Sequence, residues 1–278
     1  MPFQSKITQT LASIKRRAKA IVKAEKIQHF TALNNASIEA GYQNFRHAQN
    51  SLGLTPPTFK VVLTAFWGDR IEKKSGKETL TIILSMPWHK LIRKEQLDHC
   101  RGLANFRSGD KSYELELWGC RSDIAARGRV YAAARTLIFM EATGLRPSSG
   151  YWRAFPKICQ LHGTGIPNQD HVSVWYHPET RRYLIANEPY DQSVVDKINL
   201  QEQWCEEHDY HMIKPLWTGM YYPDGGSRLY LFSHKKKGIP LQQLAERLNT
   251  LSNSMKTENW IHTSECHSYA NQIRVITA

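Results

Sequence analysis

The residues best suited to chemistry lie between positions 171 and 190, where two strand-forming runs flank a short polar segment. Residues i and i+2 of a strand share one face, so His171, Ser173 and Trp175 are expected to line one side of a β-hairpin. His177 has the side chain whose ordinary pKa suits a general base, and Glu188 is expected at the edge of a cleft. His171, His177 and Glu188 are therefore candidate catalytic residues. An ordinary hairpin that faces solvent explains the same residues, and geometry decides between the two.

The sequence contains none of the common motifs that indicate a specific enzymatic reaction. It has no Walker loop, no G-x-G-x-x-G, no H-E-x-x-H and no G-x-S-x-G. Two groups, His208 with His211 and His262 with Cys266 and His267, offer too few ligands for zinc, which needs three or four. The five cysteines form no C-x-x-C pair. The sequence therefore predicts no metal, no cofactor and no disulfide framework.

Positive charge is concentrated at the start of the chain. The 278 residues carry a formal net charge of +12, and the first 50 hold eight Lys and Arg against two Glu. All eight tryptophans come later, from Trp67 onward. Both shifts predict a domain boundary near residue 52, with a Pro-containing linker at 53–57. We expect a basic helical module at 1–52 and an α+β domain at 58–278.

The first module is predicted to contain three helices. Apolar residues from Ile7 to Ile21 recur at helical spacing, a second helix is expected at 31–40, and a third at 43–52. Gly41 is expected to end the second helix before the third begins. This succession of helix, short turn and helix resembles a helix-turn-helix. A solvated three-helix bundle and a module that docks a protein partner are the alternatives.

The candidate nucleic-acid contacts are of two kinds. Lysine and arginine side chains on the first helix would neutralise phosphates, whereas Arg, Asn and Gln on the third could read base edges. The candidates are Lys15, Arg16, Lys19, Lys23, Lys26, Gln43, Asn44, Arg46, His47 and Asn50. The expected partner is DNA or RNA.

The remainder mixes strands and helices. Strands are expected at 61–67, 79–86 and 113–118, and helices at 88–100, 122–143, 193–207 and 241–251. Two hairpins are expected at 172–186 and 213–232. These elements predict an α+β domain with an antiparallel sheet covered on one face. The repeated Trp-Gly-x-Arg at Trp67 and Trp118 is a weak indication of a duplicated strand unit.

The segments 14–19, 29–36 and 40–48 resemble the opening segment of several uncharacterised bacterial proteins. The segments 142–148, 170–176 and 188–190 resemble the body of one such family, which carries a domain-of-unknown-function label. The resemblance implies a plasmid or integrated-element setting and brings no activity or catalytic residue with it.

The leading hypothesis is a nucleic-acid-binding accessory or regulatory protein of a bacterial mobile element. The alternatives are a toxin-like or defence-related transferase or hydrolase with its site at the 171–190 hairpin, and a protein-interaction module or inhibitor. No apolar run approaches the ~20 residues needed to cross a bilayer, and the first ten residues lack the apolar core of a signal peptide. A cytoplasmic protein without membrane contact is expected.

Overall fold

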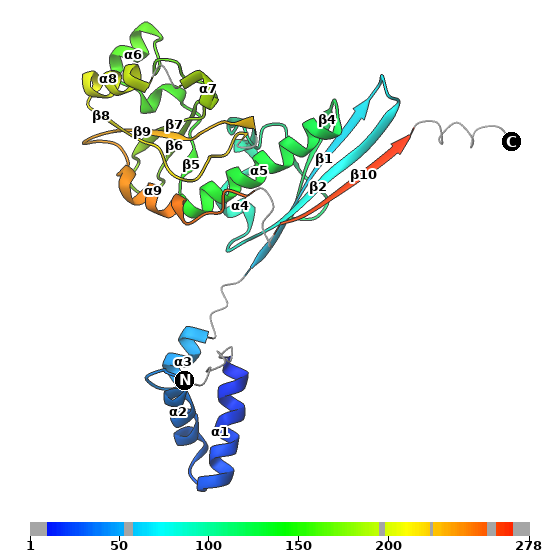
Figure 1. Cartoon of the computed structure of the whole chain (residues 1–278), viewed down its shortest axis with the longest axis vertical. Coiled ribbons are helices and arrows are strands. Elements are labelled where there is room, and N and C mark those ends of the chain that lie inside the picture. The colour runs from blue at the N-terminus through cyan, green and yellow to red at the C-terminus, as the bar shows by residue number, and fades with distance from the viewer. Residues whose placement is uncertain (1–9, 53–57, 195–197, 223–224, 255–259, 269–278) are drawn as a thin grey trace, which may run out of the picture. The chain divides into compact units, whose positions relative to one another are not determined.

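The computed structural model describes residues 10–52, 58–194, 198–222, 225–254 and 260–268 (Figure 1). The chain divides into two compact units, Met1–Thr58 and Phe59–Ala278. The predicted linker at 53–57 and the apolar residue Ile7 lie outside the described residues.

The first unit consists of α1 (Leu11–Glu25), α2 (His29–Glu39) and α3 (Phe45–Leu52). The side chains of Thr10 and Ser13 form a capping box that begins α1, and Lys26 ends it with a left-handed backbone. Residues from all three helices form a small core, namely Ile14, Ala18, Ile21, Ala32, Leu33, Ala36 and Ala48. The three predicted helices are present, and the third begins two residues later than expected.

The second unit begins with a five-stranded sheet in the order β10-β2-β1-β4-β3. Its strands are β1 (Phe59–Asp69), β2 (Lys74–Leu84), β3 (Arg107–Ser108), β4 (Glu114–Cys120) and β10 (Ile261–Ser268). The strands expected at 61–67 and 79–86 are present as β1 and β2, which form a hairpin with Phe59 opposite Leu84. However, β1 and β4 run parallel, so this sheet is mixed rather than purely antiparallel.

The parallel pairing places the two Trp-Gly-x-Arg segments side by side, since Trp67 pairs with Cys120. The Phe66 and Trp118 rings stack at the same end of the strands, with centroids 3.8 Å apart.

The second sheet is antiparallel, in the order β5-β6-β7-β9-β8. Its strands are β5 (Arg146–Pro147), β6 (Ser173–Tyr176), β7 (Tyr183–Asn187), β8 (Tyr210–Ile213) and β9 (Tyr230–His234). Both faces of this sheet are buried. Leu184 and Leu231 point into the larger core, whereas Ile185 and Phe232 point into a separate one. The second core lies against η2 (Tyr151–Ala154), α6 (Lys157–His162) and α8 (Ile198–His208).

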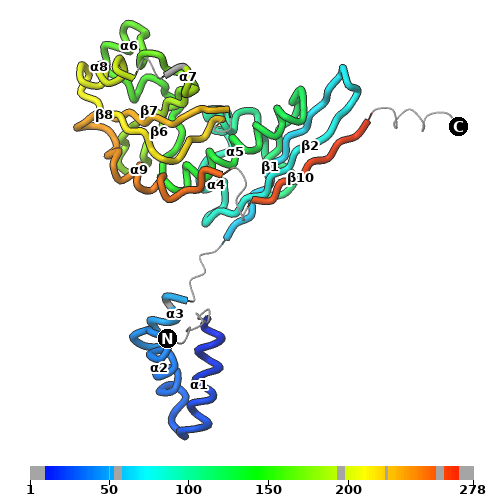
Figure 2. The backbone as a smooth tube through the Cα atoms, in the orientation of Figure 1, coloured from blue at the N-terminus to red at the C-terminus, as the bar shows by residue number. Residues whose placement is uncertain are grey.

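The long helix α5 (Asp123–Thr143) joins the two sheets (Figures 1 and 2). It packs on β1 and β2, and its buried residues share one core with Trp175 and Leu231 of the second sheet. Ser122 caps its start and Gly144 ends it with φ +72°, as the sequence predicts. The remaining helices are α7 (Asp191–Val194) and α9 (Leu241–Asn249).

Two predicted elements are wrong. The helix expected at 88–100 is broken into α4 (Trp88–Leu91) and the 3₁₀ helix η1 (Lys94–His99), because Ile92 and Arg93 are extended. The hairpin expected at 213–232 is instead formed by β8 and β9, and a long loop joins them. His262 and Cys266 lie on strand β10.

The architecture is α+β, as the sequence predicts. No helix in the described part of the chain is both long and apolar enough to span a bilayer.

Candidate functional site

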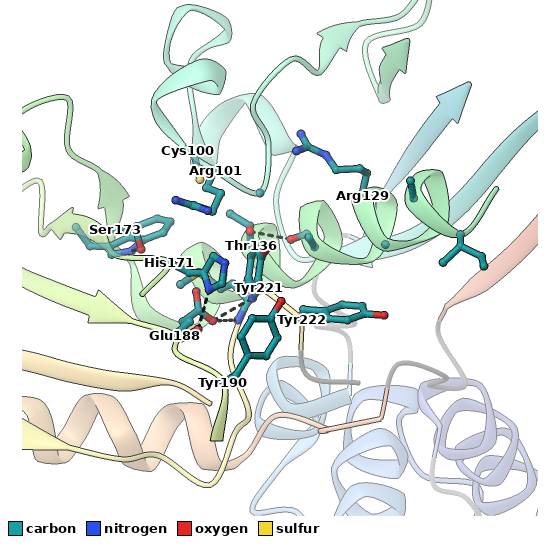
Figure 3. Close-up of a pocket in the computed structure, with 17 residues that line it drawn as sticks. Cys100, Arg101, Arg129, Thr136, His171, Ser173, Glu188, Tyr190, Tyr221 and Tyr222 are labelled. Carbon is teal, nitrogen blue, oxygen red and sulfur yellow. Dashed lines mark hydrogen bonds between the residues drawn. The ribbon is translucent and has the colours of Figure 1, made fainter. Parts of the chain in front are cut away.

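A cavity of about 310 Å³ opens beside the first half of α5 (Figure 3). Five segments surround it: the turn at 100–102, α5, the start of β6, the end of β7, and residues 220–222 of the β8–β9 loop. The predicted residues His171, Ser173, Trp175 and Glu188 all line this cavity, which we call the Glu188 pocket. Its volume lies at the lower end of the ~300–1,000 Å³ typical of small-molecule sites.

The register of the β6–β7 hairpin brings His171 and Glu188 together. Ser173 pairs with Ala186, and continuing that pairing by two residues would bring His171 to the level of Glu188. The Glu188 N–H donates to the Asp170 carbonyl at 3.0 Å, one residue out of that register, and His171 has a left-handed backbone where the ladder is interrupted. His177 lies at the turn at the other end of the hairpin, where it does not line the Glu188 pocket. The structure therefore joins two of the three candidate catalytic residues and separates the third.

Glu188 is a buried acid with a fixed orientation. Its side chain is 4% exposed, and Oε1 accepts hydrogen bonds from the backbone N–H groups of Met220 and Tyr221. Burial raises the pKa of Glu188 to about 7, although these two hydrogen bonds and the charges of Arg135 and Arg101 oppose the rise. The carboxyl group can therefore gain or lose a proton near neutral pH.

Gly219 makes the close approach of the loop possible. Its φ is +113°, and a Cβ atom there would lie 2.3 Å from Glu188 Oε1. Any other residue would both strain the backbone and displace the carboxyl group.

His171 is held beside the acid by several contacts. Its backbone is left-handed, with φ +50°, and Nδ1 lies 3.2 Å from both the Glu188 carbonyl oxygen and Asp170 Oδ1. Its ring stacks on Tyr221, with centroids 3.6 Å apart, and meets the edge of Tyr190. Burial lowers the pKa of His171, against the opposing effect of Asp170. The His171 imidazole is therefore mainly neutral at neutral pH.

Three further polar residues of the pocket were not predicted. Arg101 lies over the Tyr221 ring at 5.7 Å, and Arg129 donates from Nη2 to the Ala104 carbonyl. No pattern in the sequence marks them, because they come from elements far from the hairpin. Cys100 also lines the pocket, but burial raises its pKa to about 12, so its thiol is a poor nucleophile.

The α1 basic face consists of Lys15, Arg16, Lys19 and Lys23. All four are exposed. Successive helical residues are 100° apart, so the four fall within an arc of about 100°. In the described part of the chain none of them forms an ion pair, whereas Arg17 pairs with Glu39 at 2.7 Å. Lys26 is exposed at the end of the helix.

Two of the candidate base-reading residues, Asn44 and His47, form hydrogen bonds at the start of α3. Gln43 and Asn44 precede the helix, and the Asn44 side-chain oxygen caps it by accepting from the His47 N–H at 2.8 Å. The His47 ring in turn accepts from the Gln43 N–H at 3.1 Å. Arg46 is exposed, and the side chain of Asn50 lies outside the described residues. Asn44 and His47 therefore stabilise the start of the helix, which leaves Arg46 and the Gln43 side chain for other contacts.

The two histidine groups do not form metal sites. Among the described residues, no group of three His, Cys, Asp or Glu side chains is placed to hold a metal ion. His262 instead lies 2.7 Å from the buried Glu78 carboxylate, which also pairs with Arg127.

Comparison of the chain with protein-family models, curated proteins and solved structures gives no match. The functional proposals therefore rest on the geometry of the Glu188 pocket and of the α1 basic face.

Proposed function

We propose that the protein is a nucleic-acid-binding accessory or regulatory protein of a bacterial mobile element. The observation that supports this most strongly is the α1 basic face, which lies on the side of the helix away from Ile14 and Ile21 in the core. Four cations on one arc of a helix suit the regularly spaced phosphates of DNA or RNA. The mobile-element setting rests on the resemblance of the sequence segments.

The structure favours contacts to phosphate over contacts to bases. Lysine and arginine on α1 can neutralise phosphates, but Asn44 and His47 of the predicted reading helix are engaged in capping. We therefore expect binding that depends strongly on salt and only modestly on sequence.

The test compares K15Q/K19Q/K23Q with the unmodified chain by fluorescence anisotropy, on duplex DNA and on structured RNA. If each lysine contacts one phosphate of the duplex, the slope of log K against log salt falls in magnitude by about 2.7. The control is K90Q/K94Q/K157Q, which removes three exposed lysines of the second unit. Affinity that is flat with salt, or equal in the two triple variants, would contradict the proposal.

A second candidate function is acid–base catalysis in the Glu188 pocket, as in a transferase or hydrolase. The supporting observation is a buried carboxyl group with a pKa of about 7 beside a His171 ring whose pKa is lowered. Such a pair can hold and pass a proton near neutral pH.

Its test is a cellular phenotype caused by expression of the protein. H171A and E188Q are expected to abolish the phenotype without lowering the melting temperature, whereas H177A, from the turn of the same hairpin, retains it. A loss of phenotype that follows a loss of stability would indicate a structural role instead.

A further inference from the structure

The Glu188 pocket has an unusual wall on the side of α5. Gly128 lies in the interior of this helix and lines the cavity, and a Cβ atom there would meet no heavy atom within 4 Å. Glycine is the least favourable residue inside a helix after proline. No packing contact requires glycine at this position, and the helix presents bare backbone to the cavity there.

The other walls are aromatic. The Tyr221 ring has His171 stacked on it and Arg101 over it at 5.7 Å, and the Tyr190 ring meets His171 edge-on. Tyr222 is 40% exposed at the same cavity (Figure 3). A bare helix backbone facing aromatic rings suits a flat ring more than a branched aliphatic group.

The charges around the cavity favour an anion. Arg101 and Arg129 line it, and neither forms an ion pair with a carboxylate in the described part of the chain. Arg129 Nε is itself buried and Nη2 donates to the Ala104 carbonyl, so a ligand would meet the remaining terminal N–H groups of this side chain. The first-turn amides of α5 are already engaged, because Ala125 N–H donates to Ser122 and Ile124 N–H to Asp123. The arginines are thus the available donors for an anionic group.

Glu188 offers a hydrogen-bond acceptor to the ring of a bound ligand. Its Oε1 is occupied by two backbone N–H groups, whereas Oε2 receives no hydrogen bond from the described residues. A ring that carries N–H groups would satisfy this oxygen.

We propose that the Glu188 pocket binds a nucleotide, with the base between the α5 backbone at Gly128 and the tyrosine rings, and the phosphate at Arg101 and Arg129. The small volume fits one nucleotide, either free or at the end of a strand. The proposal concerns the second unit, and it holds whether or not the α1 basic face binds nucleic acid or the pocket catalyses a reaction.

The test is isothermal titration of the full chain with the four ribonucleoside monophosphates, their nucleosides and ribose 5-phosphate. At least one monophosphate is expected to bind at least tenfold more tightly than its nucleoside and than ribose 5-phosphate. R101Q should reduce this preference over the nucleoside at least fivefold. R70Q, which removes an exposed arginine outside the pocket, should leave it unchanged.

G128A separates binding from folding. Alanine should raise the melting temperature, because it favours the helix and has free space, yet weaken monophosphate binding at least tenfold. A 5′-phosphorylated trinucleotide that binds more tightly than the monophosphate, and is weakened by G128A and R101Q, would assign the pocket to a strand end. No binding by any monophosphate or by the trinucleotide, or binding that both variants leave unchanged, overturns the proposal.

Discussion

Burial and hydrogen bonding act on Glu188 in opposite directions. Two backbone N–H groups stabilise its carboxylate, but removal from water outweighs them, and the pKa rises to about 7. The folded protein therefore retains this proton in a pH range where the unfolded chain has released it. The stability that the proton provides is fully present below pH 4.5 and is lost as pH rises to about 7.

E188Q is expected to remove this pH dependence. Glutamine keeps an oxygen for the two N–H groups and does not ionise, so the variant gains stability relative to the native chain from pH 5 to pH 8. A rise in pKa from 4.5 to about 7 corresponds to at most ~3.4 kcal/mol of unfolding free energy. Urea denaturation at pH 5, 6, 7 and 8 measures the difference. E95Q, at an exposed glutamate, is the control, and parallel curves for E188Q and the native chain would contradict the prediction.

Part of this site could be predicted from the sequence. The face shared by His171, Ser173 and Trp175 follows from strand periodicity, and the hairpin register brings Glu188 to the level of His171. His177 lies at the turn, so the same register would have excluded it. Arg101 carries no signal because only tertiary packing brings it to the pocket, whereas Gly128, a glycine inside a strong helical pattern, could have been noticed.

At the scale of elements, α5 and the β8–β9 loop together form the pocket. Arg135 on α5 is buried, and its guanidinium donates to the Gly219 carbonyl and to the Thr218 hydroxyl. It also lies 4.5 Å from the centroid of the Trp217 ring. These contacts hold the loop whose next two residues bind Glu188.

R135M is expected to lower the free energy of unfolding by about 3 kcal/mol, because buried acceptors on the loop lose their donor. Amide exchange should accelerate at residues 216–221 more than within β1. R121M, at an exposed arginine just before α5, serves as the matched control. Equal protection of the loop in R135M and the native chain would show that the loop holds its position without this side chain.

Helices whose ends are marked by nearby capping and helix-breaking residues could be predicted from the sequence. Strands that depend on pairing with a segment far along the chain could not. Ser122, Gly144 and Pro147 mark both ends of α5 within a few residues of the chain. In contrast, β10 is a strand because it pairs with β2, about 180 residues earlier in the sequence. The boundaries of β8 depend in the same way on its pairing with β9.

At the scale of the whole molecule, the two units have cores of different kinds. Among the described residues of the first unit, four of the seven buried apolar side chains are alanines, whereas the larger core of the second contains Trp88, Phe106 and Phe139. Hydrophobic stabilisation scales with buried apolar area, so the first unit gains less.

We expect the first unit to exchange its amides faster than β1 and β2, and to unfold at a lower temperature. I14A should remove about 3 kcal/mol from the first unit and leave the second unchanged, because Ile14 is buried in a core separate from that of Phe59–Ala278. L63A should have the reverse effect. Calorimetry with hydrogen exchange measures both, and a single transition that each variant shifts as a whole would contradict independent units.

The backbone contacts to Glu188 determine how this protein can diverge. Every amino acid except proline supplies the N–H that Met220 and Tyr221 now provide, so the contact to Glu188 itself places no demand on these two side chains; Met220 is instead constrained by the core and Tyr221 by its stacking on His171. Gly219 has no such freedom, because a Cβ atom would collide with the carboxyl group. The feature to seek in distant descendants is therefore a hairpin glutamate with a downstream glycine and no proline at the two positions that follow it.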